Sequence, residues 1–211
     1  MHAALADPQR LAMVEELLLG DRSPGWFGDH WGAASNLLAH HTGVLVAAGL
    51  VVRHPSEADR RRVYLSLTED GRSLVAPPRI AGPERVVFVC THNSARSQFA
   101  EALWRCRSAI PAASGGTEPA ARVHPVARRI AARHGVELPH AVPKRVPADA
   151  LPGAFVVTVC DHADQHTPAP HHHWSVPDPV ARGGEAAFEA AWAQIAGRVA
   201  ELAATLHREG A

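Results

Sequence analysis

The sequence has 211 residues, a length that fits one large domain or two small ones. Its 21 basic and 21 acidic residues give a net charge of +0, which excludes a global attraction to nucleic acid or to an anionic membrane. Hydrophobic residues make up 46% of the chain, so we expect a packed globular core and exclude a disordered or fibrous protein.

Two further properties indicate the compartment. No apolar run approaches the roughly 20 residues needed to cross a bilayer, so no membrane partner is expected. The three cysteines, Cys90, Cys106 and Cys160, are widely spaced and odd in number, unlike a secreted disulfide framework. The sequence therefore predicts a cytoplasmic protein with reduced thiols.

The first part of the chain has the pattern of a winged helix-turn-helix. Apolar residues at helical spacing, together with turn residues, predict helices over 3–19, 26–31, 35–48 and 69–76. Two β-rich runs, 50–54 and 63–67, flank a polar stretch and predict a hairpin with a charged tip. Helices followed by such a hairpin are typical of a winged helix.

A cluster of Pro and Gly then interrupts the pattern, at Pro77, Pro78, Gly82 and Pro83. We place the domain boundary there, with a first domain over 1–78 and a second over 84–211.

The second domain predicts an α/β fold. Its expected strands are 86–89 and 154–159, and its expected helices are 97–107, 123–134 and 185–207. Alternation of strands and helices is typical of a three-layer domain with a parallel sheet, whose ligand sites lie at the carboxyl ends of the strands.

The segment from Cys90 to Ser97 lies where the first buried strand gives way to a helix. Its amides are expected to curl around one point near the helix N-terminus and form an anion-binding nest. The helix, these amides and Arg96 all favour a thiolate at Cys90, which predicts a nucleophile. Arg96 can hold two oxygens of a tetrahedral oxyanion with its planar fork. Ser94 and Ser97 can donate hydroxyl hydrogen bonds.

The run Val86-Val87-Phe88-Val89-Cys90-Thr91-His92-Asn93-Ser94-Ala95-Arg96-Ser97 resembles the signature of low-molecular-weight tyrosine phosphatases and their arsenate reductase relatives. The later run His173-Trp174-Ser175-Val176-Pro177-Asp178-Pro179 resembles the arsenate reductase branch in particular. The resemblance implies a low-molecular-weight phosphatase fold and a loop that binds arsenate or phosphate. That loop comprises Thr91, His92, Asn93, Ser94, Ala95, Arg96 and Ser97.

By the same resemblance, Cys90 attacks arsenic and Asp178 acts as general acid for the departing oxygen. A second thiol must then release arsenite, and Cys160, at the end of the second buried strand, is the candidate. A buried structural thiol is an equally weighted interpretation of Cys160. Thioredoxin-coupled relatives have a further cysteine seven residues beyond, where this chain has Thr167.

No bound cofactor is therefore expected, but an external thiol reductant is. Mycothiol with mycoredoxin, glutathione with glutaredoxin, or thioredoxin would serve as the redox partner. The histidines His162, His166, His171, His172 and His173 crowd one stretch and could bind Zn²⁺ or Ni²⁺ adventitiously. We expect no dedicated metal site, and Cys106 is expected to pack rather than react.

In the first domain, the runs Leu5-Ala6-Asp7-Pro8-Gln9-Arg10-Leu11, His40-His41 and Ala48-Gly49-Leu50-Val51 resemble the arsenic-responsive family of winged-helix repressors. The resemblance implies a recognition helix over 35–47 and a phosphate-contacting wing over 53–62. The candidate DNA-binding residues are Ser35, Asn36, His40, His41, Arg60, Arg61 and Arg62. That helix has no Arg or Lys, so a docking or homodimerisation module is the alternative to a DNA-binding one.

Three functions from different classes follow. The first is a thiol-coupled arsenate reductase fused to a winged helix, which we favour. The second is a phosphatase acting on phosphotyrosine or small phosphate esters; the only tyrosine, Tyr64, lies outside the second domain and so cannot flank an aromatic substrate there. The third is a transcriptional regulator whose second domain only senses an oxyanion.

Overall fold

The computed structural model describes residues 2–76, 80–146, 150–167 and 171–207. The chain divides into two compact units, 1–78 and 79–211, each of which is described by itself. Pro77 and Pro78, where we expected the domain boundary, lie outside the described residues, as does the end of the expected second domain at 208–211.

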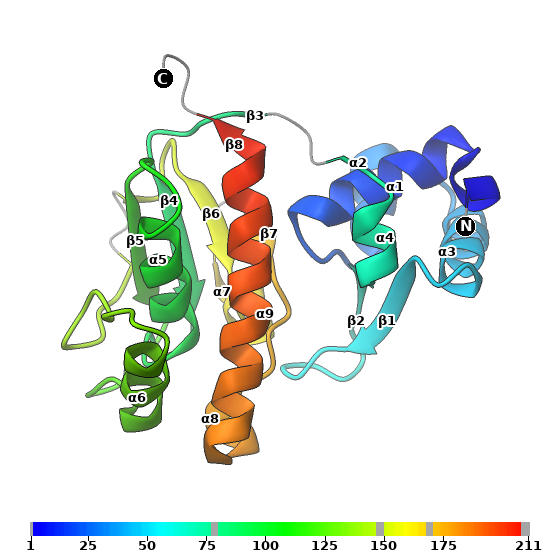
Figure 1. Cartoon of the computed structure of the whole chain (residues 1–211). Helices are drawn as coiled ribbons and strands as arrows, with labels where there is room; N and C mark the ends of the chain where they lie inside the picture. The colour runs from blue at the N-terminus through cyan, green and yellow to red at the C-terminus, as the bar shows by residue number, and fades with distance from the viewer. Residues whose placement is uncertain (1, 77–79, 147–149, 168–170, 208–211) are drawn as a thin grey trace. The chain divides into compact units, whose positions relative to one another are not determined.

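The first unit consists of helices followed by a hairpin (Figure 1). Its elements are a 3₁₀-helix, η1 (His2–Leu5), α1 (Pro8–Leu19), α2 (Pro24–Trp31), α3 (Ser35–Ala47), β1 (Val51–Pro55), β2 (Val63–Leu67) and α4 (Glu69–Ser73). Strands β1 and β2 pair antiparallel, from Val51 opposite Leu67 to Pro55 opposite Val63. Every helix and both strands expected here are present, with shifted ends.

Local hydrogen bonds explain where these helices begin and end. The Asp7 carboxylate accepts from the amides of Gln9 and Arg10, so α1 begins at Pro8 and the expected start at Ala3 is wrong. Thr68 caps α4 by accepting from the Gly71 amide, and this helix ends at Ser73, short of the expected Ala76.

The first unit has its own core. Helix α1 buries one face, and α2, α3 and the hairpin pack against it. The largest fully buried side chains are Met13, Leu17, Phe27, Leu45, Leu50 and Leu65. Because the helical and β patterns both direct apolar residues to this cluster, the unit can be held together by hydrophobic burial.

The second unit is built on a parallel sheet of four strands. The strands are β4 (Val86–Cys90), β5 (Ala112–Gly116), β6 (Phe155–Thr158) and β7 (His172–His173), in the order β5-β4-β6-β7. All three pairings are parallel, so the carboxyl ends of the strands lie at one edge. Every residue of β4 is buried, as its continuous apolar run predicts.

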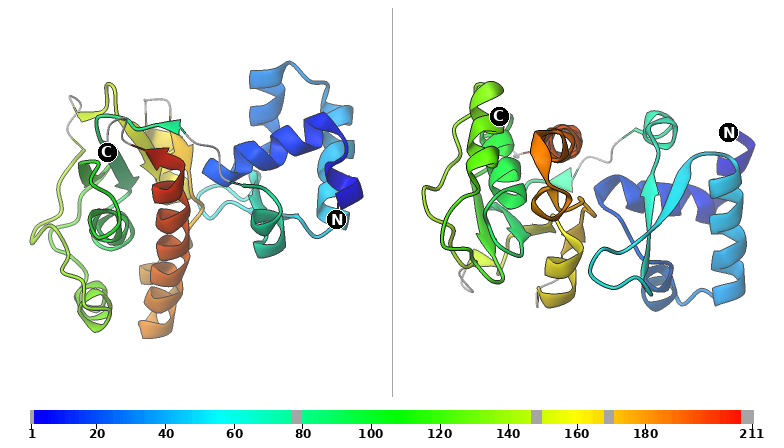
Figure 2. Two further views of the ribbon diagram at one scale, coloured as in Figure 1. Left: turned by 45° about the horizontal axis from the view of Figure 1, so that its top comes forward. Right: turned by 90° about the horizontal axis from the view of Figure 1, so that it is seen from below.

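Helices cover both faces of this sheet. Helices α5 (Arg96–Arg105) and α9 (Gly184–Thr205) pack against each other in front of the sheet in Figure 1. Helix α6 (Pro125–Arg133) lies beside α9, and the two are joined by ion pairs from Arg129 and Arg133 to Glu185. Helix α7 (Asp161–His166) lies on the other face, as the view from below shows (Figure 2). The expected three-layer arrangement is therefore present.

The sequence pattern missed several short elements. Strand β5 reads Ala-Ala-Ser-Gly-Gly and has no branched or aromatic residue, so nothing in its composition indicated a strand. Strand β7, α7 and α8 (Pro179–Arg182) are too short to show a period. The terminal helix ends at Thr205 rather than His207, because β8 (Leu206–His207) pairs with β3 (Ile80–Ala81).

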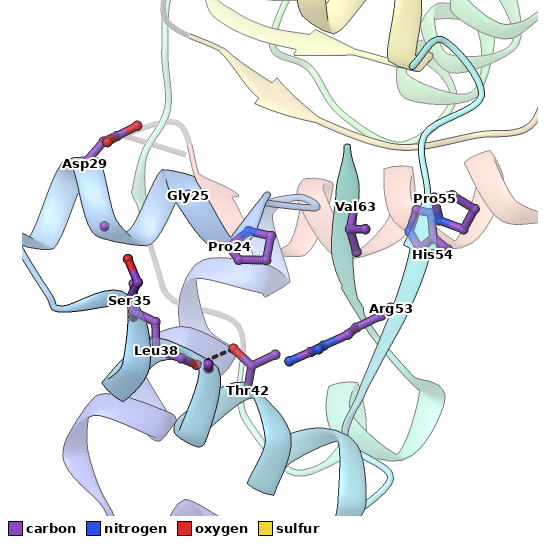
Figure 3. Close-up of a pocket in the computed structure, with 12 residues that line it drawn as sticks. Pro24, Gly25, Asp29, Ser35, Leu38, Thr42, Arg53, His54, Pro55 and Val63 are labelled. Atoms are coloured by element: carbon purple, nitrogen blue, oxygen red, sulfur yellow. Dashed lines mark hydrogen bonds between the residues drawn. The ribbon is translucent and has the colours of Figure 1, made fainter. Parts of the chain in front are cut away.

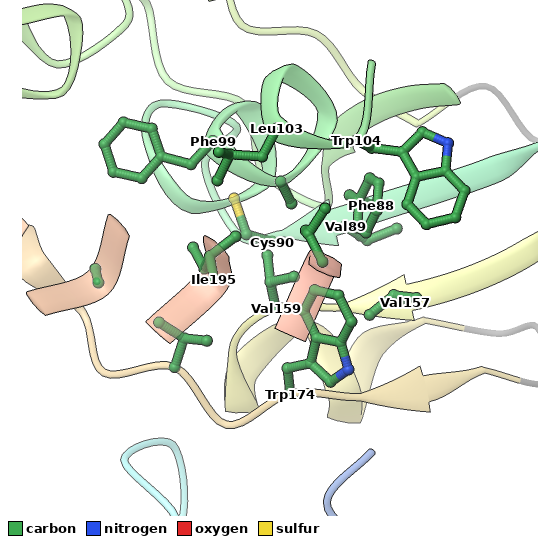
Figure 4. Packing of buried hydrophobic residues seen from close by; sticks show 14 of the residues in the cluster. Phe88, Val89, Cys90, Phe99, Leu103, Trp104, Val157, Val159, Trp174 and Ile195 are labelled. Carbon is green, nitrogen blue, oxygen red and sulfur yellow. The ribbon is translucent and has the colours of Figure 1, made fainter. Parts of the chain in front are cut away.

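The core of the second unit surrounds β4. The Phe88 ring lies 6.1 Å from the Trp104 ring and 5.8 Å from the Trp174 ring, measured between centroids. Figure 4 shows these rings together with Val157 and Ile195. In the part of the chain that the structure describes, no helix is long and apolar enough to cross a membrane.

A pair of glycine substitutions tests the packing of the first unit. A Cβ on Gly71 would overlap the Leu50 carbonyl, whereas one on Gly43, in the middle of α3, would meet nothing. We expect Gly71→Ala to lower the free energy of unfolding by about 1–3 kcal/mol. Gly43→Ala should raise it by about 0.5–1 kcal/mol. Urea unfolding followed by circular dichroism measures both, and equal stability of the two variants would contradict the packing of α4 against Leu50.

Candidate active site

The loop from Cys90 to Arg96 joins the carboxyl end of β4 to α5. The Cys90 side chain is buried and faces α5 (Figure 4). Its sulfur accepts a hydrogen bond from the Asn93 backbone amide at 3.1 Å and lies 3.1 Å from the Ser97 hydroxyl. The sulfur is thus held by two polar groups from its own loop and helix, an environment that suits a sulfur anion.

Asn93 holds the loop in shape. Its φ of 48° lies in the left-handed region, which few side chains other than asparagine adopt. Its side-chain amide donates to the hydroxyls of Ser97 at 2.8 Å and Ser114 at 3.0 Å. Its side-chain oxygen accepts from the Lys144 backbone amide at 3.0 Å. Three separate parts of the unit therefore fix one residue of the loop.

The loop carbonyls point outward, away from the Cys90 sulfur. Those of Cys90, Thr91, His92 and Ser94 accept hydrogen bonds of 2.8–3.0 Å from the backbone amides of Thr117, Glu118, Ala120 and His124. With the carbonyls engaged on the outside, loop amides are left to face inward. The residue that caps α5, Ala95, makes no side-chain hydrogen bond to the helix, so the first-turn amides of α5 are open to a ligand. Together these amides form an anion-binding nest.

Gly116, the last residue of β5, permits this close approach of loop and strand. A Cβ at this position would lie 2.6 Å from the Thr91 carbonyl oxygen and 3.1 Å from the Asn93 nitrogen. Because both of these are backbone atoms, only glycine fits here without moving the loop.

Arg96 connects the loop to the segment around Asp178. One guanidinium nitrogen donates to the Val176 carbonyl at 2.9 Å, and the other lies 3.1 Å from a carboxylate oxygen of Asp178. The second carboxylate oxygen of Asp178 accepts from the Val180 amide at 3.0 Å. The Asp178 side chain is 28% exposed, so solvent or a ligand can reach it. The structure thus places Asp178 beside Arg96, at the end of the loop that begins at Cys90.

Cys160 lies at the end of the neighbouring strand, β6, but on the other face of the sheet. Val89 pairs with Thr158, and side chains along a strand alternate between the two faces of the sheet. Thr91 and Cys160 each lie two residues beyond this pair, so they share its face, whereas Cys90 lies on the opposite face. The Cys160 sulfur accordingly lies 3.4 Å from the Thr91 hydroxyl and caps α7 by accepting from the Ala163 amide at 3.5 Å. Burial raises the pKa of the Cys160 thiol, Arg96 lowers it, and the nearby Cys90 raises it further.

The other expected loop residues differ in their surroundings. Thr91 directs its hydroxyl at Cys160, His92 is exposed, Ser94 is half-buried, and Ala95 and Ser97 are buried. The loop environment also includes residues that the sequence reading missed, namely Ser114, Gly116 and the Lys144 amide. The adjacent glycines 115 and 116 were the one available signal, since paired glycines often mark a close backbone approach.

The five clustered histidines differ in their contacts: His171 and His173 contact carboxylates, His162 and His166 stack on each other, and His172 stacks on Phe155. His173 is buried between Asp161, at 3.0 Å, and the Thr158 hydroxyl, at 2.9 Å. His171 lies 2.9 Å from Asp164. Among the described residues, no group of three or more His, Cys, Asp or Glu side chains is arranged to hold a metal ion.

In the first unit, the candidate DNA-binding residues do not all face solvent. Ser35, Asn36 and His40 are exposed on α3, and Arg60, Arg61 and Arg62 are exposed near the hairpin tip. His41 is buried, and its ring lies 2.8 Å from the Gln9 side-chain oxygen. It therefore cannot contribute to an exposed recognition face in this structure, and its inclusion among the candidates was wrong.

A cavity of about 540 Å³ lies between α2, α3 and the hairpin of this unit (Figure 3). Leu38, Pro55 and Val63 give it apolar walls, and Figure 3 shows the Arg53 side chain pointing towards Thr42 across it. The Thr42 hydroxyl donates to the Leu38 carbonyl at 2.7 Å and is thus already satisfied.

The second unit combines a parallel sheet with a cysteine-containing anion nest at its carboxyl edge, the arrangement of a cysteine-dependent enzyme acting on oxyanions. Residues 85–211 match the family described as low molecular weight phosphotyrosine protein phosphatase, so the chain belongs to this family.

Comparisons with individual proteins agree. An arsenate reductase from Brevibacillus brevis is 35% identical over 105 residues, which span 46% of this chain and 78% of that protein. The crystal structure of an arsenate reductase from Archaeoglobus fulgidus is 31% identical and matches 56% of this chain and 98% of its own, with a TM-score of 0.49. An arginine phosphatase from Geobacillus stearothermophilus is 21% identical, matches 57% of this chain and 91% of its own, and has a TM-score of 0.50. This similarity shows the fold alone.

Substitution of Gly116 tests the geometry of the nest. We expect Gly116→Ala to displace the loop at Thr91 and to weaken oxyanion binding at least tenfold, because the amides no longer converge. Protection of Cys90 from iodoacetamide by inorganic phosphate measures that binding. Gly197→Ala, in α9, is the matched control, since a Cβ there meets nothing within 4 Å. Equal protection in both variants would contradict the close approach.

Proposed function

We propose that the second unit reduces arsenate to arsenite through an arsenic adduct on Cys90. The observation that carries the proposal is the position of the Cys90 sulfur, which contacts Ser97 in the first turn of α5, the helix that Arg96 begins with its guanidinium paired to Asp178. The 35% identity to a protein named arsenate reductase supports arsenate as the substrate.

The geometry supports a first step in which the Cys90 thiolate attacks arsenic. The loop amides and the Arg96 fork stabilise the oxyanion during this attack, since they are already oriented towards it. One hydroxyl group leaves arsenic and takes a proton from the Asp178 carboxyl group, so the products are water and a Cys90–arsenic adduct. The exposure of Asp178 lets this proton be replaced from solvent.

In the second step, we propose that the Cys160 thiolate attacks the Cys90 sulfur. A disulfide forms, the sulfur–arsenic bond breaks, and its electron pair reduces arsenic to arsenite. The proximity of the two cysteines supports this role, since Cys90 and Arg96 both influence the pKa of Cys160. An external thiol then reduces the disulfide, either a low-molecular-weight thiol with a glutaredoxin-like partner or thioredoxin. Free thiols at all three cysteines suit a reducing compartment such as the cytoplasm.

Phosphatase activity on phosphotyrosine or a small phosphate ester is the alternative, because phosphate and arsenate have the same shape and the loop chemistry is shared. The only tyrosine of the chain, Tyr64, lies in the first unit, which leaves no tyrosine beside Asp178 to contact an aromatic substrate. This favours a small inorganic oxyanion over phosphotyrosine.

Variants of three residues test the mechanism in an arsenite-release assay with a thiol reductant. We expect Cys90→Ser to abolish turnover, because no adduct can form. Asp178→Asn should lower kcat by about 10²–10⁴, the usual contribution of a general acid. Cys160→Ser should stop turnover after Cys90 is consumed. Cys106→Ser, on the exposed C-terminal cap of α5, is the control. Full arsenite release by Cys90→Ser would overturn the proposal.

We propose further that the first unit is a winged helix-turn-helix module that binds DNA as a homodimer. Three helices followed by an antiparallel hairpin support this, with α3 as the recognition helix and Arg60, Arg61 and Arg62 beside the wing tip. Arg61 is bonded to Asp59 at 3.0 Å, so the exposed Arg60 is the better phosphate contact. In this form the protein would be both enzyme and oxyanion-responsive regulator.

A gel-shift assay with the protein's own promoter region tests DNA binding. We expect Arg60→Ala to weaken binding and to make it less dependent on salt, because a phosphate contact is lost. Arg129→Ala, on α6 of the second unit, is the matched control. The absence of a shift for the unaltered protein, together with a dimer in light scattering, would assign the unit to dimerisation alone.

A further inference from the structure

A second cavity of about 460 Å³ lies at the carboxyl edge of the parallel sheet, entirely within the second unit. Its apolar wall consists of Val89, Val146 and Leu151. Val89 shares a sheet face with Cys160 by strand alternation, so the cavity lies on the face that carries Cys160 and α7. Its volume is within the range of pockets that hold small organic molecules.

His166 and Thr167 line this cavity and are hydrogen-bonded within α7, at 2.7 Å each, but three other polar groups of the lining are not paired with described residues. Glu118 and Arg145 both line it, and neither side chain forms an ion pair with any described residue. The Thr117 hydroxyl also lines it and is buried without a hydrogen-bond partner among the described residues. One carboxylate, one guanidinium and one unsatisfied hydroxyl above an apolar wall suit a ligand that has an ammonium, a carboxylate and a short carbon chain.

Hydrogen bonds through Thr91 connect the lining of the cavity to Cys160. The Glu118 backbone amide donates to the Thr91 carbonyl at 2.8 Å, and the Thr91 hydroxyl lies 3.4 Å from the Cys160 sulfur. Helix α7 begins directly after Cys160 and ends at His166, which lines the cavity. Thr91 therefore contacts both a residue of the cavity lining and the Cys160 sulfur.

The chain itself offers no third thiol to continue an electron transfer. It contains three cysteines, and Cys106 lies exposed at the far end of α5, about 15 Å along the helix from the Cys90 loop. A disulfide between Cys90 and Cys160 must therefore be reduced from outside.

We propose that this cavity binds a small thiol with an amino-acid zwitterion, its carboxylate on Arg145 and its ammonium on Glu118. The inference rests on the proposed function and names its reductant. The bound thiolate attacks the Cys160 sulfur of the Cys90–Cys160 disulfide, the sulfur–sulfur bond breaks, and Cys90 leaves as the thiolate. A second molecule of the same thiol attacks the mixed disulfide, which releases the oxidised thiol dimer and restores Cys160.

Steady-state arsenate reduction by the full chain tests this with two reductants. Glutathione has the zwitterion, and dithiothreitol lacks it. We expect Arg145→Gln and Glu118→Gln each to raise KM for glutathione about tenfold with little change in kcat, the effect of losing about 1.4 kcal/mol of binding. Rates with dithiothreitol should stay within twofold. Arg129→Gln, an exposed arginine outside the cavity, is the matched control. An unchanged KM for glutathione in both cavity variants overturns the proposal.

A binding measurement separates this proposal from the proposed function. S-methylglutathione has the zwitterion but no free thiol, so it binds without turnover. We expect calorimetry to detect its binding to the unaltered protein and its loss in Arg145→Gln. If neither thiol, with or without glutaredoxin, nor thioredoxin supports arsenate reduction, the proposed function fails, and S-methylglutathione binding still tests the cavity proposal. If dithiothreitol supports reduction and S-methylglutathione does not bind, the cavity proposal fails and the function stands.

Discussion

The hydrogen bonds to the side chain of Asn93 hold the candidate active site in shape. They join β5, through Ser114, to α5, through Ser97, and to the segment at Lys144, so the loop is fixed from three sides. The left-handed backbone of Asn93 turns its own amide towards the Cys90 sulfur. Because such a backbone conformation costs energy, these bonds have to compensate for it, and the anion nest depends on them.

Arg96 extends this constraint to the other end of the second unit. Its guanidinium contacts both Val176 and Asp178, about 80 residues away in sequence, and it is itself buried. A buried guanidinium without partners would be strongly destabilising, so these contacts are needed for the fold as well as for chemistry. The same two bonds fix the segment of Asp178, the proposed general acid, against the loop of Cys90, the proposed nucleophile.

The sequence indicated the parts of this arrangement that have a strong local pattern. The apolar run of β4, the loop from Cys90 and the helix after it could be read directly, because a buried parallel strand is continuously apolar. Strand β5 could not, since Ala-Ala-Ser-Gly-Gly has no β-forming residue and becomes a strand only by pairing with β4. The burial of His41 depends on Gln9, 32 residues earlier, and no local period reveals such a contact. Nor could the sequence show on which face of the sheet Cys160 lies, because that follows from the register between β4 and β6.

The cap that the Cys160 sulfur provides for α7 has a consequence for the shape of the oxidised protein. The sulfur accepts from the Ala163 amide and lies on the sheet face opposite to that of Cys90, so the proposed disulfide requires the Cys160 side chain to turn towards Cys90. A covalent link between the two sulfurs would leave the start of a six-residue helix without its cap. The proposed disulfide would therefore weaken the first turn of α7, and a loosened helix start would mark the molecules that await reduction.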